Sequence, residues 1–155
     1  ALAARGRSPS NAAAFCQGDA LSLPLSDASV SLVTCAFGIR NFQNLRRGLD
    51  EMFRVLRPGG RTIILEFTVP RRPLLRRLYL FYLKRILPLL AGAVSGDRSG
   101  AYRYLPQSVV SFADRESIRS SLETAGVSDV VSHPLSFGIV SIYVGTKADP
   151  LSASV

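Results

Sequence analysis

The sequence predicts an α/β fold with a parallel sheet, because two strand-like runs flank one amphipathic helix. Residues 30–37 are apolar and β-branched, and Gly38 ends the run. Residues 45–56 place apolar side chains at helical spacing, with charged residues between them. A Pro-Gly-Gly turn at 58–60 ends that helix and precedes the second run, at 61–67. A strand, a helix and a strand in this order form a parallel pair joined by a right-handed crossover.

The remaining segments predict further strands and helices around this unit. The signals are a short buried strand at 13–17, helices at 74–91 and 111–125, and two last strands at 127–132 and 137–144. Asn44 is placed to cap the helix that follows it, and Ser111 or Asp114 lies near the start of the later one. Gly126 is placed to end that later helix.

Length and composition are those of one globular domain. The chain has 155 residues, 47% of them hydrophobic and 19% charged, which excludes the disordered and collagen-like classes. In this interpretation residues 1–147 form a partial domain and 148–155 a C-terminal tail. Residues 1–14 lack the pattern of a signal peptide. Their Arg, Ser and Ala content matches either a transit peptide or the end of a helix and a loop from a longer chain. We expect a cytoplasmic protein, or one of an organelle matrix if the source is eukaryotic.

The basic charge of the chain indicates an anionic partner. The formal net charge is +8, which suits nucleic acid, anionic lipid or a negatively charged ligand. Residues 74–91 form a helix with one apolar and one basic face, typical of a helix that lies on an anionic membrane. A lid that packs its apolar face on the sheet has the same pattern, and both interpretations stand. Charges and Pro88 exclude a transmembrane span. We expect a peripheral contact of 74–91 with the inner face of the membrane.

Polar residues follow three of the predicted strands, where ligands of an open α/β sheet bind. Asp19, after Gly18, can accept a hydrogen bond from an exocyclic amine or simply form a turn. Arg40 and Asn41 point to the same cleft, unless they are a surface arginine and a capping asparagine. Glu66 ends an apolar strand and can bind a ligand or a neighbouring helix terminus.

The two cysteines match neither a metal site nor a redox pair. Cys16 and Cys35 lie 19 positions apart in apolar runs, so we expect both to be reduced and buried.

Three motifs resemble the menaquinone and ubiquinone biosynthesis C-methyltransferases. Arg-Val-Leu-Arg-Pro-Gly-Gly-Arg at 54–61, followed by Ile-Leu-Glu-Phe-Thr at 64–68, is similar to that family's signature. Phe-Gly-Ile-Arg-Asn at 37–41 and Tyr-Arg-Tyr-Leu-Pro-Gln-Ser at 102–108 resemble two further family segments. Arg57 and Thr68 stand where the family usually has Lys and Ser. The resemblance runs from about residue 13 to residue 147.

The resemblance implies a class I, Rossmann-like methyltransferase fold that binds S-adenosylmethionine and lacks the first strands of the sheet. By motif position Asp19 and Ala20 would contact the adenine. Ala36 matches a position that is Ser in many relatives, so only its backbone would serve the cofactor. The glycine-rich loop and the ribose-binding acid of the family would lie before Ala1. We therefore expect an exposed sheet edge, and a chain that is poorly folded or inactive by itself.

The same resemblance implies methylation of a demethyl-quinol ring carbon, on demethylmenaquinol or a ubiquinone precursor. Arg40 would stabilise the phenolate or polarise a water, and Asn41 would orient that water. An arginine stays protonated and cannot itself be the base. Tyr102 and Tyr104 would contact the quinol ring, unless they belong to the core. His133 precedes Pro134 in an expected loop between strands, and a catalytic role for it is the weaker interpretation.

Two alternatives from other classes remain. One is a non-catalytic fragment or partner subunit without a complete cofactor site. The other is an RNA-binding methyltransferase-like domain, which the basic charge would suit. The basic residues cluster in a hydrophobic helix rather than in a groove with exposed aromatic side chains, so we expect no nucleic acid partner. The motifs indicate no oligomeric state.

Overall fold

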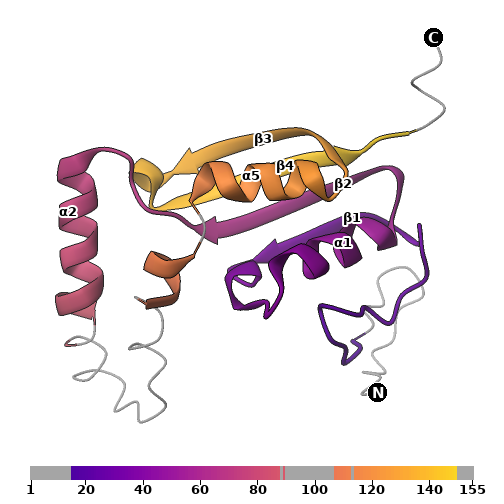
Figure 1. Ribbon diagram of the computed structural model, residues 1–155, viewed down its shortest axis with the longest axis horizontal. Helices are drawn as coiled ribbons and strands as arrows, with labels where there is room; N and C mark the ends of the chain where they lie inside the picture. Colours follow the sequence, from indigo (N-terminus) through magenta and orange to yellow (C-terminus); the bar gives the residue numbers. More distant parts are fainter. Residues whose placement is uncertain (1–14, 88, 90–106, 113, 150–155) are drawn as a thin grey trace, which may run out of the picture.

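The structure is a computed structural model, and it describes residues 15–87, 89, 107–112 and 114–149 (Figure 1). The described chain folds around one mixed four-stranded sheet in the order β1-β2-β4-β3. The strands are β1 (Val30–Ala36), β2 (Leu56–Phe67), β3 (Val127–Leu135) and β4 (Val140–Lys147). Strands β1 and β2 are parallel, while β4 is antiparallel to both of its neighbours. Among the described residues β1 forms one edge of the sheet, as the resemblance led us to expect.

Helix α1 (Leu45–Val55) forms the crossover between the parallel strands, which confirms the predicted strand-helix-strand unit. The side chain of Asn44 caps it by accepting a hydrogen bond of 3.0 Å from the backbone N–H of Arg47. Leu49, Met52 and Val55 recur on one face and are buried.

The Pro-Gly-Gly segment at 58–60 does not end this helix. The helix ends at Val55, and Leu56 already has extended backbone angles as the first residue of β2. Gly59 has a φ of 72°, and the pairing with β1 jumps from Val30↔Leu56 to Leu32↔Arg61. The segment is therefore an irregularity within the strand, where glycine allows the left-handed backbone.

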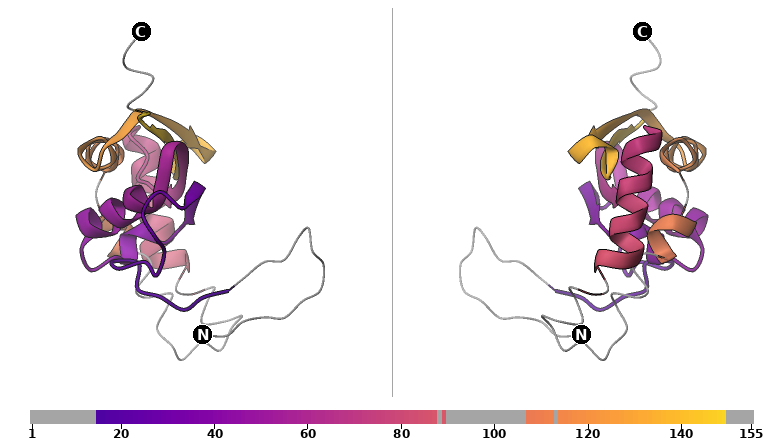
Figure 2. Two further views of the ribbon diagram at one scale, coloured as in Figure 1. Left: turned by 90° about the vertical axis from the view of Figure 1, so that its right-hand side faces the viewer. Right: turned by 90° about the vertical axis from the view of Figure 1, so that its left-hand side faces the viewer.

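Helix α5 (Arg115–Thr124) packs on the same face of the sheet as α1 (Figures 1 and 2). It begins later than the helix predicted at 111–125, because Asp114 caps it. The side chain of Asp114 accepts a 2.8 Å hydrogen bond from the backbone N–H of Ser117. Residues 107–111 form a separate short helix. The core lies between the two helices and the sheet and includes Ile39, Leu49, Ile64, Ile118, Leu122 and Tyr143.

Helix α2 (Pro73–Phe81) stands at one end of the sheet, beyond the carboxyl ends of β1 and β2, and continues as the π-helical turn η2 (Tyr82–Ile86) (Figures 1 and 2). Tyr79 and Leu83 are buried against the end of the sheet and the short helix at 107–111. The helix predicted at 74–91 is confirmed as far as the structure describes it.

Several predicted boundaries were wrong. Residues 15–18 have no regular structure, so the part of the predicted strand at 13–17 that the structure describes is not a strand. Cys16 is exposed, while Cys35 is half-buried. An apolar run becomes a strand only beside a pairing partner, and the described sheet offers this segment none. The strand predicted at 127–132 extends to Leu135. The last strand starts at Val140, after the 3-10 turn η3 (Ser136–Gly138), where Gly138 has a φ of 90°. No helix within the described ranges has the length and apolar composition that crossing a bilayer requires.

Candidate functional site

The carboxyl ends of β1 and β2 lie together because the two strands are parallel. Beyond Ala36 the chain turns through Phe37, which has a φ of 54° and donates its N–H to the carbonyl of Leu65 at 2.7 Å. The 3-10 helix η1 (Ile39–Asn41) follows at once. This local geometry places Arg40 over the end of β2, the edge at which open α/β sheets bind ligands.

A buried ion pair forms the centre of this edge. Arg40 Nη1 lies 2.8 Å from Glu66 Oε1, and the side chain of Glu66 is fully buried while that of Arg40 is 10% exposed. Glu66 also accepts hydrogen bonds from the backbone N–H of Arg40, at 3.3 Å, and of Phe67, at 2.9 Å. Three N–H donors therefore surround a carboxylate that has no access to water, which keeps the charged form compatible with burial.

Two phenylalanine rings complete the surroundings of Arg40. Its guanidinium carbon lies 5.3 Å from the ring centre of Phe67, within the range of a cation–π contact. The Phe37 and Phe67 ring centres are 4.5 Å apart. Arg40 Nη1 also donates to the Phe37 carbonyl at 2.6 Å, while the buried Nε has no hydrogen-bond partner among the described residues. A guanidinium fixed at this edge of the sheet suits an oxyanion or a carbonyl of a ligand.

The structure brings Asn41 together with the residues expected at the adenine. A cavity of about 340 Å³ is lined by Asp19, Ala20, Leu21, Asn41, Phe42 and Gln43. Asn41 is exposed, and its Nδ2 lies 3.4 Å from the Phe37 carbonyl to which Arg40 also donates. Asp19 Oδ1 accepts a 2.9 Å hydrogen bond from the backbone N–H of Leu21, so the Asp19 carboxylate also stabilises the turn at 19–22. Two segments that the sequence singled out separately thus form one cavity.

The other predicted site residues do not join this group. Ala36 is exposed at the end of β1, where it pairs with Leu65, and it lines none of the described cavities. Tyr102 and Tyr104 lie outside the described residues. The expectation of a loop at His133 was wrong, because it lies within β3, paired with Ile142 at the other edge of the sheet from β1.

Cys35 is not suited to nucleophilic chemistry. Burial raises the pKa of its thiol, and the charge of Glu66 raises it further. The thiol is therefore protonated at neutral pH, which agrees with its interpretation as a small core residue.

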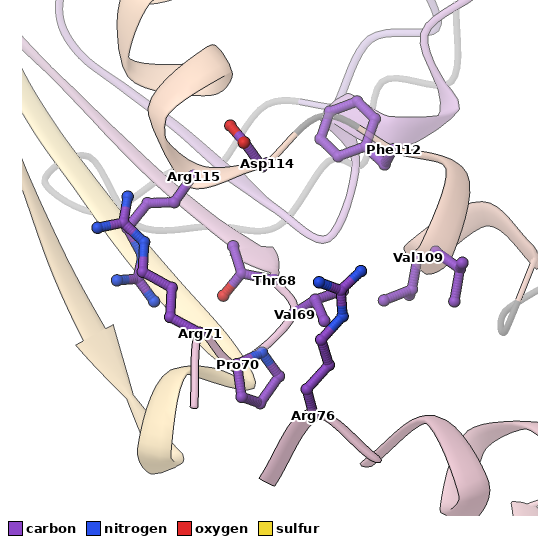
Figure 3. Close-up of a pocket in the computed structure, with 10 residues that line it drawn as sticks. Thr68, Val69, Pro70, Arg71, Arg76, Val109, Phe112, Asp114 and Arg115 are labelled. Carbon is purple, nitrogen blue, oxygen red and sulfur yellow. The ribbon is translucent and has the colours of Figure 1, made fainter. Parts of the chain in front are cut away.

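A second cavity, of about 330 Å³, lies past the end of β2 and was not anticipated (Figure 3). Its walls come from the segment after β2, from α2, from residues 109–112 and from the start of α5, and they include Arg71, Arg76 and Arg115. Arg115 Nε donates to Ser141 Oγ at 3.0 Å, and Ser141 lies 3.1 Å from Thr68 Oγ1. Only folding brings these segments together. The one signal in the sequence is the Pro-Arg-Arg-Pro run at 70–73 directly after a strand.

Comparison with known proteins places these features in a family. The model of the ubiE/COQ5 methyltransferase family matches residues 4–147. A ubiquinone/menaquinone biosynthesis C-methyltransferase UbiE of Geobacter sulfurreducens is 44% identical over 81% of this chain and 48% of its own length. A demethylmenaquinone methyltransferase of Thermus thermophilus is 44% identical over 86% of this chain and 60% of its own. The chain thus spans about half the length of the curated relatives it matches.

A solved structure supports the fold. A SAM-dependent methyltransferase of Thermotoga maritima, described as a possible histamine N-methyltransferase, superposes with a TM-score of 0.56 at 22% identity. The match covers 84% of this chain and 62% of that one. The described sheet is therefore a part of a Rossmann-like methyltransferase fold.

Proposed function

Because the chain belongs to the ubiE/COQ5 methyltransferase family, we propose that the protein transfers a methyl group from S-adenosylmethionine to a ring carbon of a demethyl quinol. Demethylmenaquinol or a ubiquinone precursor is the substrate, in the biosynthesis of isoprenoid quinones. The names of the relatives from Geobacter sulfurreducens and Thermus thermophilus support this chemistry. The observation that carries the proposal is the Arg40–Glu66 pair at the carboxyl edge of β1 and β2.

The cavity at Asp19 fits the adenine end of the cofactor. It offers the Asp19 carboxylate as an acceptor for an exocyclic amine, and Ala20 as a small side chain that lets a flat ring approach. S-adenosylmethionine, when bound, supplies the electrophilic methyl group. The residues of this chain hold and orient the ligands around it.

Arg40 acts on the quinol oxygen. Methylation of a ring carbon requires an electron-rich ring, so the site must favour the phenolate form of the quinol. The guanidinium of Arg40, held at the carboxyl edge of β1 and β2, stabilises the phenolate oxygen. Glu66 fixes the orientation of that guanidinium and prevents it from turning into the core. Phe37 and Phe67 offer an apolar surface for the quinol ring.

Helix α2 brings the enzyme to the membrane that holds the quinol. Its buried side contributes Tyr79, while Leu74, Leu78 and Phe81 are 70%, 58% and 58% exposed. Phe137, at a neighbouring turn, is 83% exposed. Exposed basic residues accompany these apolar side chains, namely Arg72, Arg77, Lys84 and Arg85. We infer that the helix packs against the end of the sheet through its buried side and contacts an anionic bilayer through its exposed apolar and basic side chains.

A methyl-transfer assay tests the proposal. The full chain is incubated with S-adenosylmethionine labelled in its methyl group and with a short-tailed demethylmenaquinol or a demethyl benzoquinol. We expect label in the quinol product, and its distribution between the two substrates identifies the ring. A chain that binds both ligands but transfers no label to either would contradict the proposal and favour a non-catalytic partner subunit.

A further inference from the structure

Three arginines surround the cavity past the end of β2. Arg71 follows the strand, Arg76 comes from α2 and Arg115 begins α5, and all three line one space of about 330 Å³. Figure 3 shows the guanidinium groups of Arg71 and Arg115 near each other, with that of Arg76 on the opposite side of Thr68. Arg71 and Arg115 also line a second, adjoining cavity together, so the two lie close in space. Like charges gathered on one cavity create a strongly positive potential there.

The acidic side chains nearby neutralise only part of this charge. Glu116 Oε2 lies 3.7 Å from Arg71 Nη2, a long and solvent-exposed pair. Asp114 also lines the cavity, and its carboxylate, which caps α5 through the backbone of Ser117, offsets part of the charge of Arg71. Within the described ranges no carboxylate pairs with Arg76 or Arg115.

A buried polar cluster holds Arg115 in place. Its Nε donates to Ser141 Oγ, which is fully buried, and Ser141 contacts Thr68, which is 3% exposed. The hydroxyl of Thr68 donates in turn to the carbonyl of Gly138 at 2.9 Å. Arg115 is thus oriented by neutral partners, which leave its charge uncompensated. Such preorganisation is what a guanidinium site for an oxyanion requires.

We propose that this cavity binds a phosphate group. Three guanidinium groups from different elements line the cavity, and together they offer donors to the several oxygens of a phosphate rather than to the two oxygens of one carboxylate. The phosphate belongs either to a lipid headgroup, since the adjoining cavity includes Leu75 and Phe137, or to a free phosphate-bearing molecule. No residue of this cavity belongs to the Arg40–Glu66 site, so the proposal stands apart from methyl transfer.

Titration calorimetry with inorganic phosphate at constant ionic strength tests the site in the full chain. We expect Arg76→Gln, and separately Arg115→Gln, to weaken phosphate binding by about 10-fold or more, because each removes a charge-assisted hydrogen bond. Arg76 is exposed and has no ion pair among the described residues, so its replacement leaves the fold intact even if Arg115→Gln does not. Arg61→Gln is the matched control, since Arg61 is exposed near the other end of β2.

A second experiment, with lipid vesicles, identifies the source of the phosphate. Sedimentation with vesicles of phosphatidylglycerol and phosphatidylcholine is compared for the wild type and Arg76→Gln. Loss of vesicle binding in the variant, with competition by phosphate, supports a lipid headgroup. Weaker phosphate binding with unchanged vesicle binding supports a free phosphate compound. The proposal is overturned if the wild type does not bind phosphate, or if Arg61→Gln weakens binding as much as the two cavity variants.

Discussion

Arg40 and Glu66 face each other across the carboxyl ends of β1 and β2, with 2.8 Å between Nη1 and Oε1. They are 26 positions apart in the chain, and both are almost without access to water. A buried carboxylate is costly unless it is paired and hydrogen-bonded, and Glu66 accepts from three N–H groups. The pair therefore fixes a guanidinium at the edge at which open α/β sheets bind ligands, and the orientation of this group depends on both partners.

Replacement of Glu66 by Gln should destabilise the protein strongly. Removal of one partner leaves a buried charge on Arg40, which costs about 3–5 kcal/mol in the free energy of unfolding. Urea unfolding measures this difference. Asp50→Asn is the control, because the Arg46–Asp50 pair is about half exposed and its loss should cost roughly 0.5 kcal/mol or less. Equal effects of the two variants would show that burial does not set the strength of the Arg40–Glu66 pair.

Arg40→Lys should lower the rate of methyl transfer while the protein stays folded. A lysine keeps the positive charge but cannot donate at once to Glu66, to the Phe37 carbonyl and to a ligand in one plane. We expect kcat to fall by about 100-fold, the range for loss of one oxyanion donor. Single-turnover transfer of labelled methyl measures it, with Arg46→Lys, in the exposed pair with Asp50 on α1, as the control. An unchanged kcat would remove Arg40 from the reaction.

The contribution of Glu51 to stability should depend on pH. The hydrogen bond from Arg54 is the main cause that lowers the pKa of Glu51 from 4.5 to about 2. A folded-state pKa below the unfolded one adds stability that is complete above about 4.5 and is lost as the pH falls towards about 2. The difference in urea midpoint between wild type and Glu51→Gln should therefore shrink over this range. A difference that stays constant with pH would contradict the assigned cause.

The two cysteines should differ in reactivity. Cys16 is exposed, whereas Cys35 is half-buried and its pKa is raised by burial. Thiolate is the reactive form, so iodoacetamide at neutral pH should modify Cys16 in the folded protein well before Cys35. Peptide mass spectrometry over time gives the two rates, and urea should make them similar. Equal rates without denaturant would show that Cys35 is accessible in the native state.

Helix α2 should determine binding to anionic membranes. The triple variant Arg77→Glu, Lys84→Glu and Arg85→Glu reverses charge on exposed positions and should reduce sedimentation with phosphatidylglycerol vesicles. Leu78→Ser with Phe81→Ser should reduce it as well, because both side chains are 58% exposed and available for insertion. The triple variant Arg46→Glu, Arg57→Glu and Arg61→Glu, at exposed positions outside α2, changes the net charge by the same amount and serves as the control. Vesicle binding that survives both sets of changes would remove the membrane contact from the proposal.

The strand-helix-strand unit was predictable because its signals are local. Asn44 is a capping residue, and the apolar spacing from Leu45 to Val55 has the period of a helix. The end of this helix was less predictable, because Pro58 and Gly59 stop a helix or kink a strand equally well. Pairing of β2 with β1 decided between these outcomes. The apolar run around Cys16 was misleading for the same reason, since strand formation depends on a neighbour that the run itself does not specify.

The sequence by itself determined the α/β class and the parallel pair around α1, and it singled out Arg40 and Asn41 as candidate site residues, because periodicity, caps and motifs are encoded within short segments. Only the tertiary structure decided that Glu66 is the partner of Arg40, that Asp19 and Asn41 share one cavity, and that three arginines from separate elements surround another. Contacts between residues far apart in the chain follow from strand register and helix packing. Those are set by the burial of the whole core, and no single segment contains that information.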